Sequence, residues 1–297
     1  MSSLSALIHR NTKLFFRDKG MFFTSLITPV ILLVLYATFL GSIFQKTFES
    51  VIPAEMNAPD GIINALVGGQ LLSSLLAVCC VTVAFMSNML MVQDKVSGAR
   101  SDLTMTPIKR STLALSYYIS TAISTLIICV IATAVGFIYL TSNGWYMTFS
   151  DVMLVFADVF LLVMFGTALS SIVNCFLSSQ GQMTALGTII SAGYGFICGA
   201  YMPISEFSDG LQKVLSFLPG TYGTSLIRNH IMRGALDELS NIGLPSEGIN
   251  AIKDGIDCNF YFFGDKVELN TMYLILGGSV ILLIAVYVLL NILKRKN

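Results

Sequence analysis

Six stretches of the chain are long and apolar enough to cross a lipid bilayer, and this pattern limits the fold more than any other feature. A membrane-spanning helix needs about 20 residues that are mainly apolar. Only 11% of the 297 residues are charged, whereas a typical soluble domain has about 25%. The sequence therefore predicts an all-α membrane protein with one membrane domain over residues 1–297. Its six expected spans cover residues 22–44, 64–92, 112–140, 152–177, 183–203 and 271–293.

The distribution of charge predicts how the chain is oriented. Lys and Arg residues gather in the N-terminal arm, in the loop at 93–111 and in the tail, whereas the short loops on the other side hold only Lys46. Cytoplasmic loops carry such an excess of basic residues. Both termini and the loop at 93–111 are therefore expected to be cytoplasmic in a multi-pass protein of the cell membrane. The net charge is zero, so a nucleic-acid partner has no electrostatic support.

The N-terminal arm has the periodicity of an amphipathic helix. Its apolar and basic residues fall on different helical faces, as in helices that lie in the membrane interface. Residues 1–21 are interpreted as an elbow helix leading into the first span, and a simple anchoring segment is the alternative. The apolar face holds Leu4, Leu7, Ile8, Leu14 and Phe15, and the basic face holds Arg10, Lys13 and Arg17.

The loop at 204–270 is the one sizeable external element that the orientation predicts. Residues 211–232 are too apolar for a free loop, and Pro219 and Gly220 interrupt them. Two short re-entrant helices in the outer leaflet fit this pattern, because irregular backbone at that depth must be covered by protein. Residues 234–270 are expected to form a small exposed cap.

Signs of catalytic or metal chemistry are missing from the sequence. It has no phosphate-binding loop of the form G-x-x-x-x-G-K-[ST]. His9 and His230 lie outside the expected spans and away from other metal-ligating residues. Five cysteines lie in apolar runs and Cys258 lies in a polar region without an evident partner, so a disulfide is not expected. The chain is therefore predicted to have no catalytic residue, metal or cofactor.

Asp158 is the one acidic residue well inside an expected span. Acidic side chains are costly in lipid, which makes them candidates for function. Asp158 lies about two helical turns, roughly 9 Å, from the outer edge of its span, where water can reach it. An interfacial or helix-packing role is favoured, and a role in binding substrate or protons stays open.

The expected fifth span has hydroxyl groups at helical spacing, with glycines among them. Small and hydroxylated residues let membrane helices approach closely and form hydrogen bonds. Helix packing is one interpretation and lining of a transport pathway is the other. The residues concerned are Thr184, Thr188, Ser191 and Tyr194.

The polar segment at 93–107 is predicted to be a short helix, a bend and a restart. Asp94 is expected to cap the first helix, Gly98 to allow the bend, and Thr106 and Pro107 to begin the following helix. An apolar patch beside charged residues suits a surface helix that docks on a partner, and an ordinary solvated loop is the alternative. The candidate contact residues are Asp94, Lys95, Gly98, Arg100, Asp102, Leu103, Thr106 and Pro107.

Two motifs give the chain a family resemblance. One is an acid–base pair, a Gly, a Leu and a Thr-Pro nine residues past the Gly; the other is a Pro, a Thr-Tyr and an Arg nine residues past the Pro, after an upstream Met-Pro. With these spacings the sequence resembles the membrane subunits of type-2 ATP-binding cassette (ABC) exporters. The first motif comprises Asp94, Lys95, Gly98, Leu103, Thr106 and Pro107, and the second Pro219, Thr221, Tyr222 and Arg228 after Met202 and Pro203.

The resemblance implies a permease subunit of a bacterial exporter. Family members have six spans, an elbow helix, a cytoplasmic coupling loop and re-entrant helices before the last span. Two permease copies, in a homodimer or heterodimer, would each dock on a separate ATPase subunit that holds ATP and Mg. ATP-driven closure would push the coupling helix at 94–103 and open a path lined by the second and fifth spans. The resemblance assigns an external gate to Pro203, Pro219, Thr221, Tyr222 and Arg228.

The chain departs from the family pattern at two positions. Family members often have a Glu three residues after the coupling Gly, where this chain has Ser101 followed by Asp102. They also often have a Glu six residues after the external Pro, where this chain has Ser225. Whether Ser101 or Asp102 makes the usual polar contact with the ATPase stays open.

The expected substrate is hydrophobic or amphipathic: a drug, a peptide or a lipid-like molecule. A permease for a polysaccharide or a lipid-linked glycan is the alternative within the family. Outside the family, the alternatives are an ion-coupled secondary transporter and a membrane scaffold without transport activity.

Overall fold

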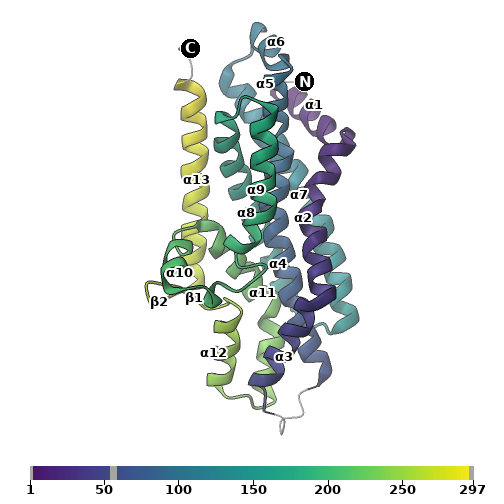
Figure 1. The fold of residues 1–297 in the computed structure, drawn as a ribbon, viewed down its shortest axis with the longest axis vertical. Coiled ribbons are helices and arrows are strands. Elements are labelled where there is room, and N and C mark those ends of the chain that lie inside the picture. The colour runs from purple at the N-terminus through teal and green to yellow at the C-terminus, as the bar shows by residue number, and fades with distance from the viewer. Residues whose placement is uncertain (1–2, 54–58, 294–297) are drawn as a thin grey trace.

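The computed structural model describes residues 3–53 and 59–293 as an elongated helical bundle with one small β-hairpin (Figure 1). The described ends of α1 and α13 lie at the same end of the bundle as α5 and α6. The elements are α1 (Ser3–Arg17), α2 (Lys19–Leu35), the π-helical turn η1 (Tyr36–Leu40), α3 (Gly41–Val51), α4 (Asp60–Asn88), α5 (Leu90–Val96), α6 (Ala99–Met105), α7 (Arg110–Asn143), α8 (Phe149–Phe176), α9 (Gln180–Ile197), the 3₁₀ turn η3 (Ile204–Glu206), α10 (Asp209–Leu215), α11 (Pro219–Asn241), α12 (Ser246–Gly255), β1 (Phe260–Phe262), β2 (Asp265–Val267) and α13 (Leu269–Leu293).

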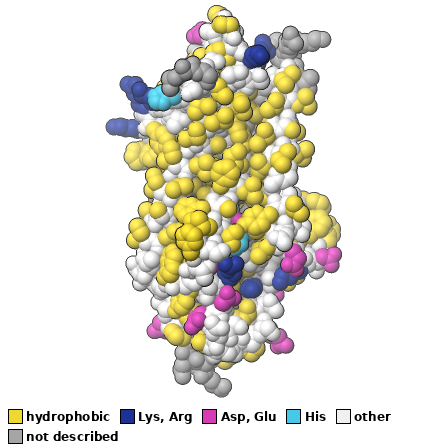
Figure 2. All heavy atoms as spheres, turned by 180° about the vertical axis from the view of Figure 1, so that it is seen from behind, with side chains coloured by type: hydrophobic (Ala, Val, Ile, Leu, Met, Phe, Trp, Pro, Cys, Tyr) yellow, Lys and Arg dark blue, Asp and Glu magenta, His cyan; other side chains and the backbone are white. Residues whose placement is uncertain are grey.

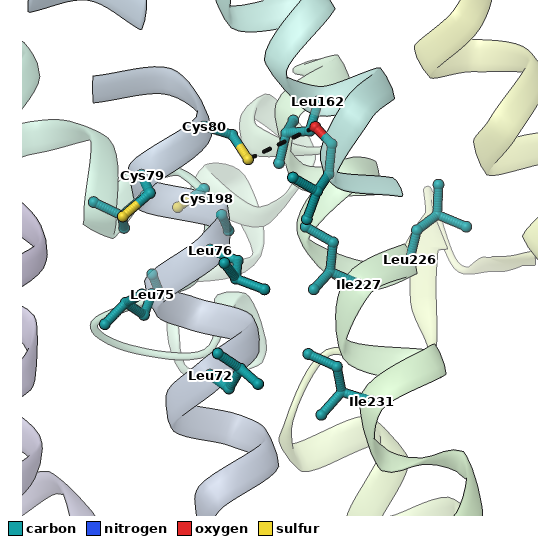
Figure 3. Close-up of a cluster of buried hydrophobic side chains, with 14 of the residues drawn as sticks. Leu72, Leu75, Leu76, Cys79, Cys80, Leu162, Cys198, Leu226, Ile227 and Ile231 are labelled. Carbon is teal, nitrogen blue, oxygen red and sulfur yellow. Dashed lines mark hydrogen bonds between the residues drawn. The ribbon is translucent and has the colours of Figure 1, made fainter. Parts of the chain in front are cut away.

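Helix α4 is the centre of the bundle. It packs against α2, α7, α8, α9 and α11, and it is apolar on every face, as buried helices are. Figure 3 shows Leu72, Leu76 and Cys80 of α4 on the side toward Leu162 of α8 and Ile227 and Ile231 of α11, whereas Leu75 and Cys79 point the other way. The thiol of Cys80 also donates to the backbone oxygen of Val159, at 3.9 Å. The helix that leads to the 93–107 segment is thus held from all sides.

Five helical segments among the described residues are long and apolar enough to cross a membrane: 19–51, 60–96, 110–143, 149–176 and 269–292. Figure 2 shows apolar side chains over the middle of one face and charged side chains nearer its two ends. The expected span at 183–203 is not among the five. Helix α9 has 18 residues, includes Gln180 and Gln182, and ends where Gly199 takes a left-handed conformation (φ +72°), a common helix terminator. The count of six spans therefore stays a prediction.

The N-terminal region is helical, as its periodicity predicts. Helix α1 buries Leu7 and Phe15 and packs against α7, and Asp18 separates it from α2 by capping Met21 N at 3.0 Å. The expected first span, 22–44, is longer in the structure because α2 continues through the π-helical turn into α3. The elbow at the membrane interface stays a prediction.

The region 204–270 differs from the two short helices and exposed cap that the sequence predicts. The chain does break before Pro219, which is the first residue of α11. Helix α11, however, continues for 23 residues to Asn241 and is largely buried. Gly223 and Gly234 have no side chain, so at these positions α11 can lie in close contact with Leu162 and Tyr146. The cap after it buries Leu244, Ile249, Ile252, Ile256, Cys258 and Phe260.

Candidate functional site

The segment at 93–107 forms two short helices joined at Gly98. Helix α5 follows α4 after Met89, and α6 turns away from it because Gly98 has φ +83°. This left-handed conformation favours glycine. The predicted bend at Gly98 is therefore present.

Asp94 lies inside α5 and connects three helices rather than capping one. The two terminal nitrogens of Arg10 in α1 donate to its carboxylate at 2.7 and 3.1 Å. The hydroxyl of Tyr117 in α7 donates to the same carboxylate at 2.5 Å. The hydrogen bond to Asp94 raises the pKa of the Arg10 guanidinium above its ordinary value. The predicted capping role of Asp94 is wrong, because its carboxylate is used by side chains distant in sequence.

Lys95 attaches the same helix to α8. Its ammonium donates to the backbone oxygens of Asn174, Cys175 and Leu177 at 2.9 to 3.0 Å. These carbonyls are at the carboxyl end of α8, where helix carbonyls lack partners within the helix and the helix dipole favours a positive charge. The acid–base pair of the first motif thus fixes α5 to α1, α7 and α8.

Helix α6 presents a different surface, since each of its residues is at least partly exposed. Met105 is 83% exposed, and Ser101 and Asp102 are exposed as well. Arg100 is half-buried, and Leu103 contacts the cluster around Leu7, Met91 and Tyr117. Of the candidate contact residues, those on α6 can meet another protein, whereas Asp94 and Lys95 are engaged within the chain.

Thr106 and Pro107 are exposed, but they do not begin the next helix. Thr106 is the residue that ends α6, and its hydroxyl donates back to the Leu103 oxygen at 2.6 Å. Helix α7 begins at Arg110 with Lys109 before it. The predicted role of Thr106 and Pro107 as the start of the next helix is wrong, because the Thr106 hydroxyl bonds to a backbone oxygen of the preceding helix instead.

Arg228 is the centre of a second polar cluster, where α11 meets α4 and the cap. Its side chain is fully buried and donates to the backbone oxygens of Ile256 and Gly199 at 2.5 and 3.0 Å. It also donates to Ser74 of α4 at 3.3 Å and lies 3.5 Å from a carboxylate oxygen of Asp257. One guanidinium therefore connects α11, α4, the end of α9 and the cap.

Asp257 extends this cluster to the segment after α9. Its carboxylate accepts from the backbone nitrogens of Ile204 and Ser205 at 2.6 and 3.2 Å. Burial raises the pKa of Asp257, and the charge of Arg228 opposes that shift. Pro203, next to this contact, is buried. The sequence contained no signal for Asp257 as the partner of Arg228.

Thr221 and Tyr222 hold the corner between α10 and α11. The hydroxyl of Tyr222 donates to the Ser216 oxygen at 2.6 Å, and that of Thr221 donates to the Leu218 oxygen at 2.6 Å. Ser225, where family members often have a Glu, donates to the Cys258 oxygen at 3.2 Å. The predicted gate residues from 219 to 228 therefore share one buried helix, and their polar groups contact the cap and the corner.

A buried polar trio lies between α8, α11 and α13. His230 Nδ1 is 2.6 Å from a carboxylate oxygen of Asp158, and the Tyr273 hydroxyl donates to the other oxygen. Asp158 is fully buried, so the expected contact with interfacial water is wrong. No sequence pattern pointed to the pairing of His230 with Asp158. Asp158 and His230 lie at the same depth in the bundle because α11 runs beside α8.

A cleft of about 610 Å³ lies between α2, α4 and α9. Three of the four candidate pathway residues line it, namely Thr184, Thr188 and Ser191. Tyr194 instead is buried. Its hydroxyl lies in space that a side chain at position 220 would fill, and this space is free because residue 220 is Gly. The rest of the lining is mostly apolar, and its polar members are Asp18, Thr24 and Gln93. Four methionines are part of it: Met21, Met86, Met89 and Met183.

Comparison with known proteins identifies the family. A search of curated proteins found no match. Residues 53–293 match the family described as ABC-2 family transporter protein. This match includes Asp94, Lys95 and Tyr117 but not Arg10, and it includes the Arg228 cluster, the polar trio and most of the described helices. Over most of its length, therefore, the chain belongs to the ABC-2 transporter family, whose permeases normally work with an ATPase subunit.

Proposed function

We propose that this chain is the membrane subunit of an ATP-driven exporter in a bacterial cell membrane. Two copies, identical or related, would each dock on a separate ATPase subunit that binds ATP and Mg. Both termini would be cytoplasmic, α1 would be the elbow, and α9 would complete six spans. The observation that carries the proposal is the exposed helix α6, attached through Gly98 to a helix that three others hold.

The contacts of α5 explain how a push on α6 would reach the spans. Asp94 connects α5 to α1 and α7, and Lys95 connects it to the end of α8. A displacement of α5 would therefore move several helices together instead of bending one loop. The exposed residues of α6, with Asp102 as the acidic group in its first turn, would form the contact with the ATPase.

Site-specific crosslinking tests the docking site. A photoreactive amino acid at Met105 should crosslink to an ATP-hydrolysing subunit that is co-expressed with the chain. The same amino acid at Phe149 should not crosslink to that subunit. Phe149 is also exposed, but it lies at the start of α8, at the other end of the bundle. Asp102→Ala should then lower the ATPase activity that depends on the complex. Equal crosslinking from both positions, or none from Met105, would contradict the assignment.

The cleft between α2, α4 and α9 is the proposed substrate path. It opens on the outer surface of the single chain, where Thr184, Thr188 and Ile189 are exposed, so a second permease copy would close it. Its methionines can adapt to apolar groups of different shape, because the side chain is flexible and polarizable. Aromatic residues, on which sugars stack, are not part of the lining. These features favour hydrophobic or amphipathic substrates over glycans.

Cysteine labelling tests the path. Thr188→Cys should react slowly with a bulky maleimide when the complex carries substrate, whereas Lys213→Cys on exposed α10 should react equally with and without it. A Thr188→Cys that reacts equally in both states would place the path elsewhere. In such a case the docking experiment could still succeed, which separates the two parts of the proposal.

The buried trio of Asp158, His230 and Tyr273 is the feature that an ion-coupled transporter would use. However, none of the three lines the cleft. The trio joins α8, α11 and α13, on elements other than the three that enclose the proposed path. We therefore propose a structural role for it, in which it fixes α11 against two spans.

A further inference from the structure

An aromatic patch is exposed on the external part of the chain. Phe217 follows α10, and Phe262 and Phe263 lie at the turn between β1 and β2. The ring centroids are 5.3, 5.7 and 4.9 Å apart. The three side chains are 63%, 36% and 56% exposed. Clustered apolar side chains of this kind mark a surface that binds a membrane or another molecule.

The backbone of the hairpin turn is unusual for a large side chain. Phe262 pairs with Asp265, so Phe263 and Gly264 are the two turn residues, with φ of +52° and +97°. Turns of this kind favour Asn or Asp followed by Gly, because a bulky residue is strained at positive φ. Residues in such conformations often have a functional role. The strained position holds a ring that remains more than half exposed.

The patch lies at the depth of the outer membrane interface. Strand β2 ends at Val267 and the span-like helix α13 begins at Leu269, and a three-residue strand reaches only about 10 Å. Exposed apolar side chains such as Leu274 and Ile281 give α13 a surface that suits contact with lipid. Figure 1 shows α10 and the hairpin beside the external end of α13, whereas α12 extends farther from it.

We propose that Phe217, Phe262 and Phe263 form an anchor that inserts into the outer leaflet of the bilayer. Aromatic rings favour the boundary between headgroups and acyl chains. The ammonium of Lys213 lies 5.9 Å from the centre of the Phe263 ring, where it can meet a lipid phosphate while the ring enters the apolar layer. Exposed Asp209 precedes Lys213 on α10, and exposed Asp265 follows the Phe263–Gly264 turn. These acidic groups offset the positive charge of Lys213, so the anchor does not require anionic lipid.

The anchor is joined to the corner that begins α11. Phe217 lies between Ser216, whose backbone oxygen accepts from Tyr222, and Leu218, whose oxygen accepts from Thr221. Insertion would thus fix the depth of this corner and of the buried helix behind it. This inference concerns the lipid contact: its assignment to the outer leaflet rests on the proposed orientation, and it does not depend on export activity.

Fluorescence quenching by brominated lipid tests the anchor. The sequence has one tryptophan, Trp145, so a Trp145→Phe background can carry one probe at a time. Phe217→Trp and Phe262→Trp report on the patch, and Ala251→Trp, on an exposed position of α12, is the matched control. In phosphatidylcholine vesicles with bromine near the headgroup end of the acyl chains, both patch probes should be quenched several-fold more than the control. Both leaflets have the same lipid, so the orientation of the protein does not matter.

Patch probes that are quenched as little as the control would overturn the proposal, because the patch would then face water or protein. A second variant separates anchoring from packing. Phe263→Asn keeps a residue that accepts positive φ and removes the ring, so the Phe217→Trp probe should be quenched less while the melting temperature in detergent stays the same or rises. A lower melting temperature with unchanged quenching would assign the ring to internal packing and refute the anchor.

Discussion

Arg10 and Asp94 are joined by two hydrogen bonds although 84 residues separate them. With Tyr117 as a third partner, the carboxylate connects α1, α5 and α7 at the cytoplasmic end that we propose. We therefore propose that the acid of the coupling motif transmits displacement within the subunit. In this proposal the contact with an ATPase subunit falls to α6, which begins only after Gly98.

Asp94→Asn should destabilise this end of the bundle. The variant replaces charge-assisted hydrogen bonds by weaker ones around a group that water hardly reaches, which should lower the free energy of unfolding by about 1–3 kcal/mol. Thermal unfolding of the purified protein in detergent measures the loss, with Lys13→Gln, an exposed change on α1, as control. Combining Arg10→Asp with Asp94→Arg should restore part of it. If the reversed pair is no better than its single variants, the ion pair does not stabilise the fold.

Gly98→Val should impair coupling through the backbone alone. A side chain at this position would point into open space, so the effect comes from φ +83°, which costs a β-branched residue about 1–2 kcal/mol. Gly98→Asn, which tolerates this conformation, is the control. We expect ATP hydrolysis by the assembled complex to lose its link to transport with Val and to keep it with Asn. Equal behaviour of the two variants would show that the left-handed bend is not needed.

Gly234→Ala should disrupt the packing of α11. The added methyl group would overlap the backbone oxygen of Tyr146, which is rigid, so the helix must move and the protein should lose at least 1–3 kcal/mol of stability. Gly277→Ala in α13 meets open space and should be neutral or slightly stabilising, since Ala favours helix by about 0.5–1 kcal/mol. The yield and the melting temperature in detergent report both effects. A stable Gly234→Ala protein would mean that α11 is not held against Tyr146.

His230→Phe should be more harmful than Asp158→Asn. The first change leaves a fully buried carboxylate with Tyr273 as its one remaining contact of the trio, and breaking a buried pair in this way costs about 3–5 kcal/mol. The second keeps hydrogen-bonding groups next to both His230 and Tyr273. Melting temperatures of the two variants decide the order. The reverse order would mean that the charge of Asp158, and not the hydrogen-bonded geometry, stabilises the trio.

Local patterns predicted those parts of the structure that local forces decide. Long apolar runs predicted the central helices, Gly98 predicted a bend, and Pro219 predicted a break in the apolar segment before α11. The pairing of Asp158 with His230 could not be predicted, because it requires α11 to run beside α8 at a depth that no local pattern specifies. Thr106 and Pro107 have the composition of a helix start, yet the Thr106 hydroxyl bonds to the preceding turn.

The candidate pathway residues show the same limit. Thr184, Thr188 and Ser191 line one cleft, which follows from their helical spacing. Tyr194 is three residues further on and has the same periodicity, but Gly220 of α11 lets its ring pack inside the bundle. Which member of a helical row becomes buried depends on the neighbouring helix.

Arg228→Lys should lose most of the stability that the polar cluster around Arg228 provides. The guanidinium uses its two terminal nitrogens to contact Ile256, Gly199 and Ser74 beside Asp257, and a single ammonium cannot reproduce this planar geometry. We expect a loss of about 1–3 kcal/mol for each buried carbonyl oxygen that is left without a donor. Arg233, five residues later on α11, is the matched control because its own side chain is 44% exposed, although its partner Asp151 is buried. A Lys can keep this single contact with its ammonium toward water, so Arg233→Lys should be tolerated. Limited proteolysis of the cap, together with the melting temperature in detergent, measures both variants. Equal sensitivity of the two would mean that charge, and not the shape of the Arg228 side chain, holds the cap on the bundle.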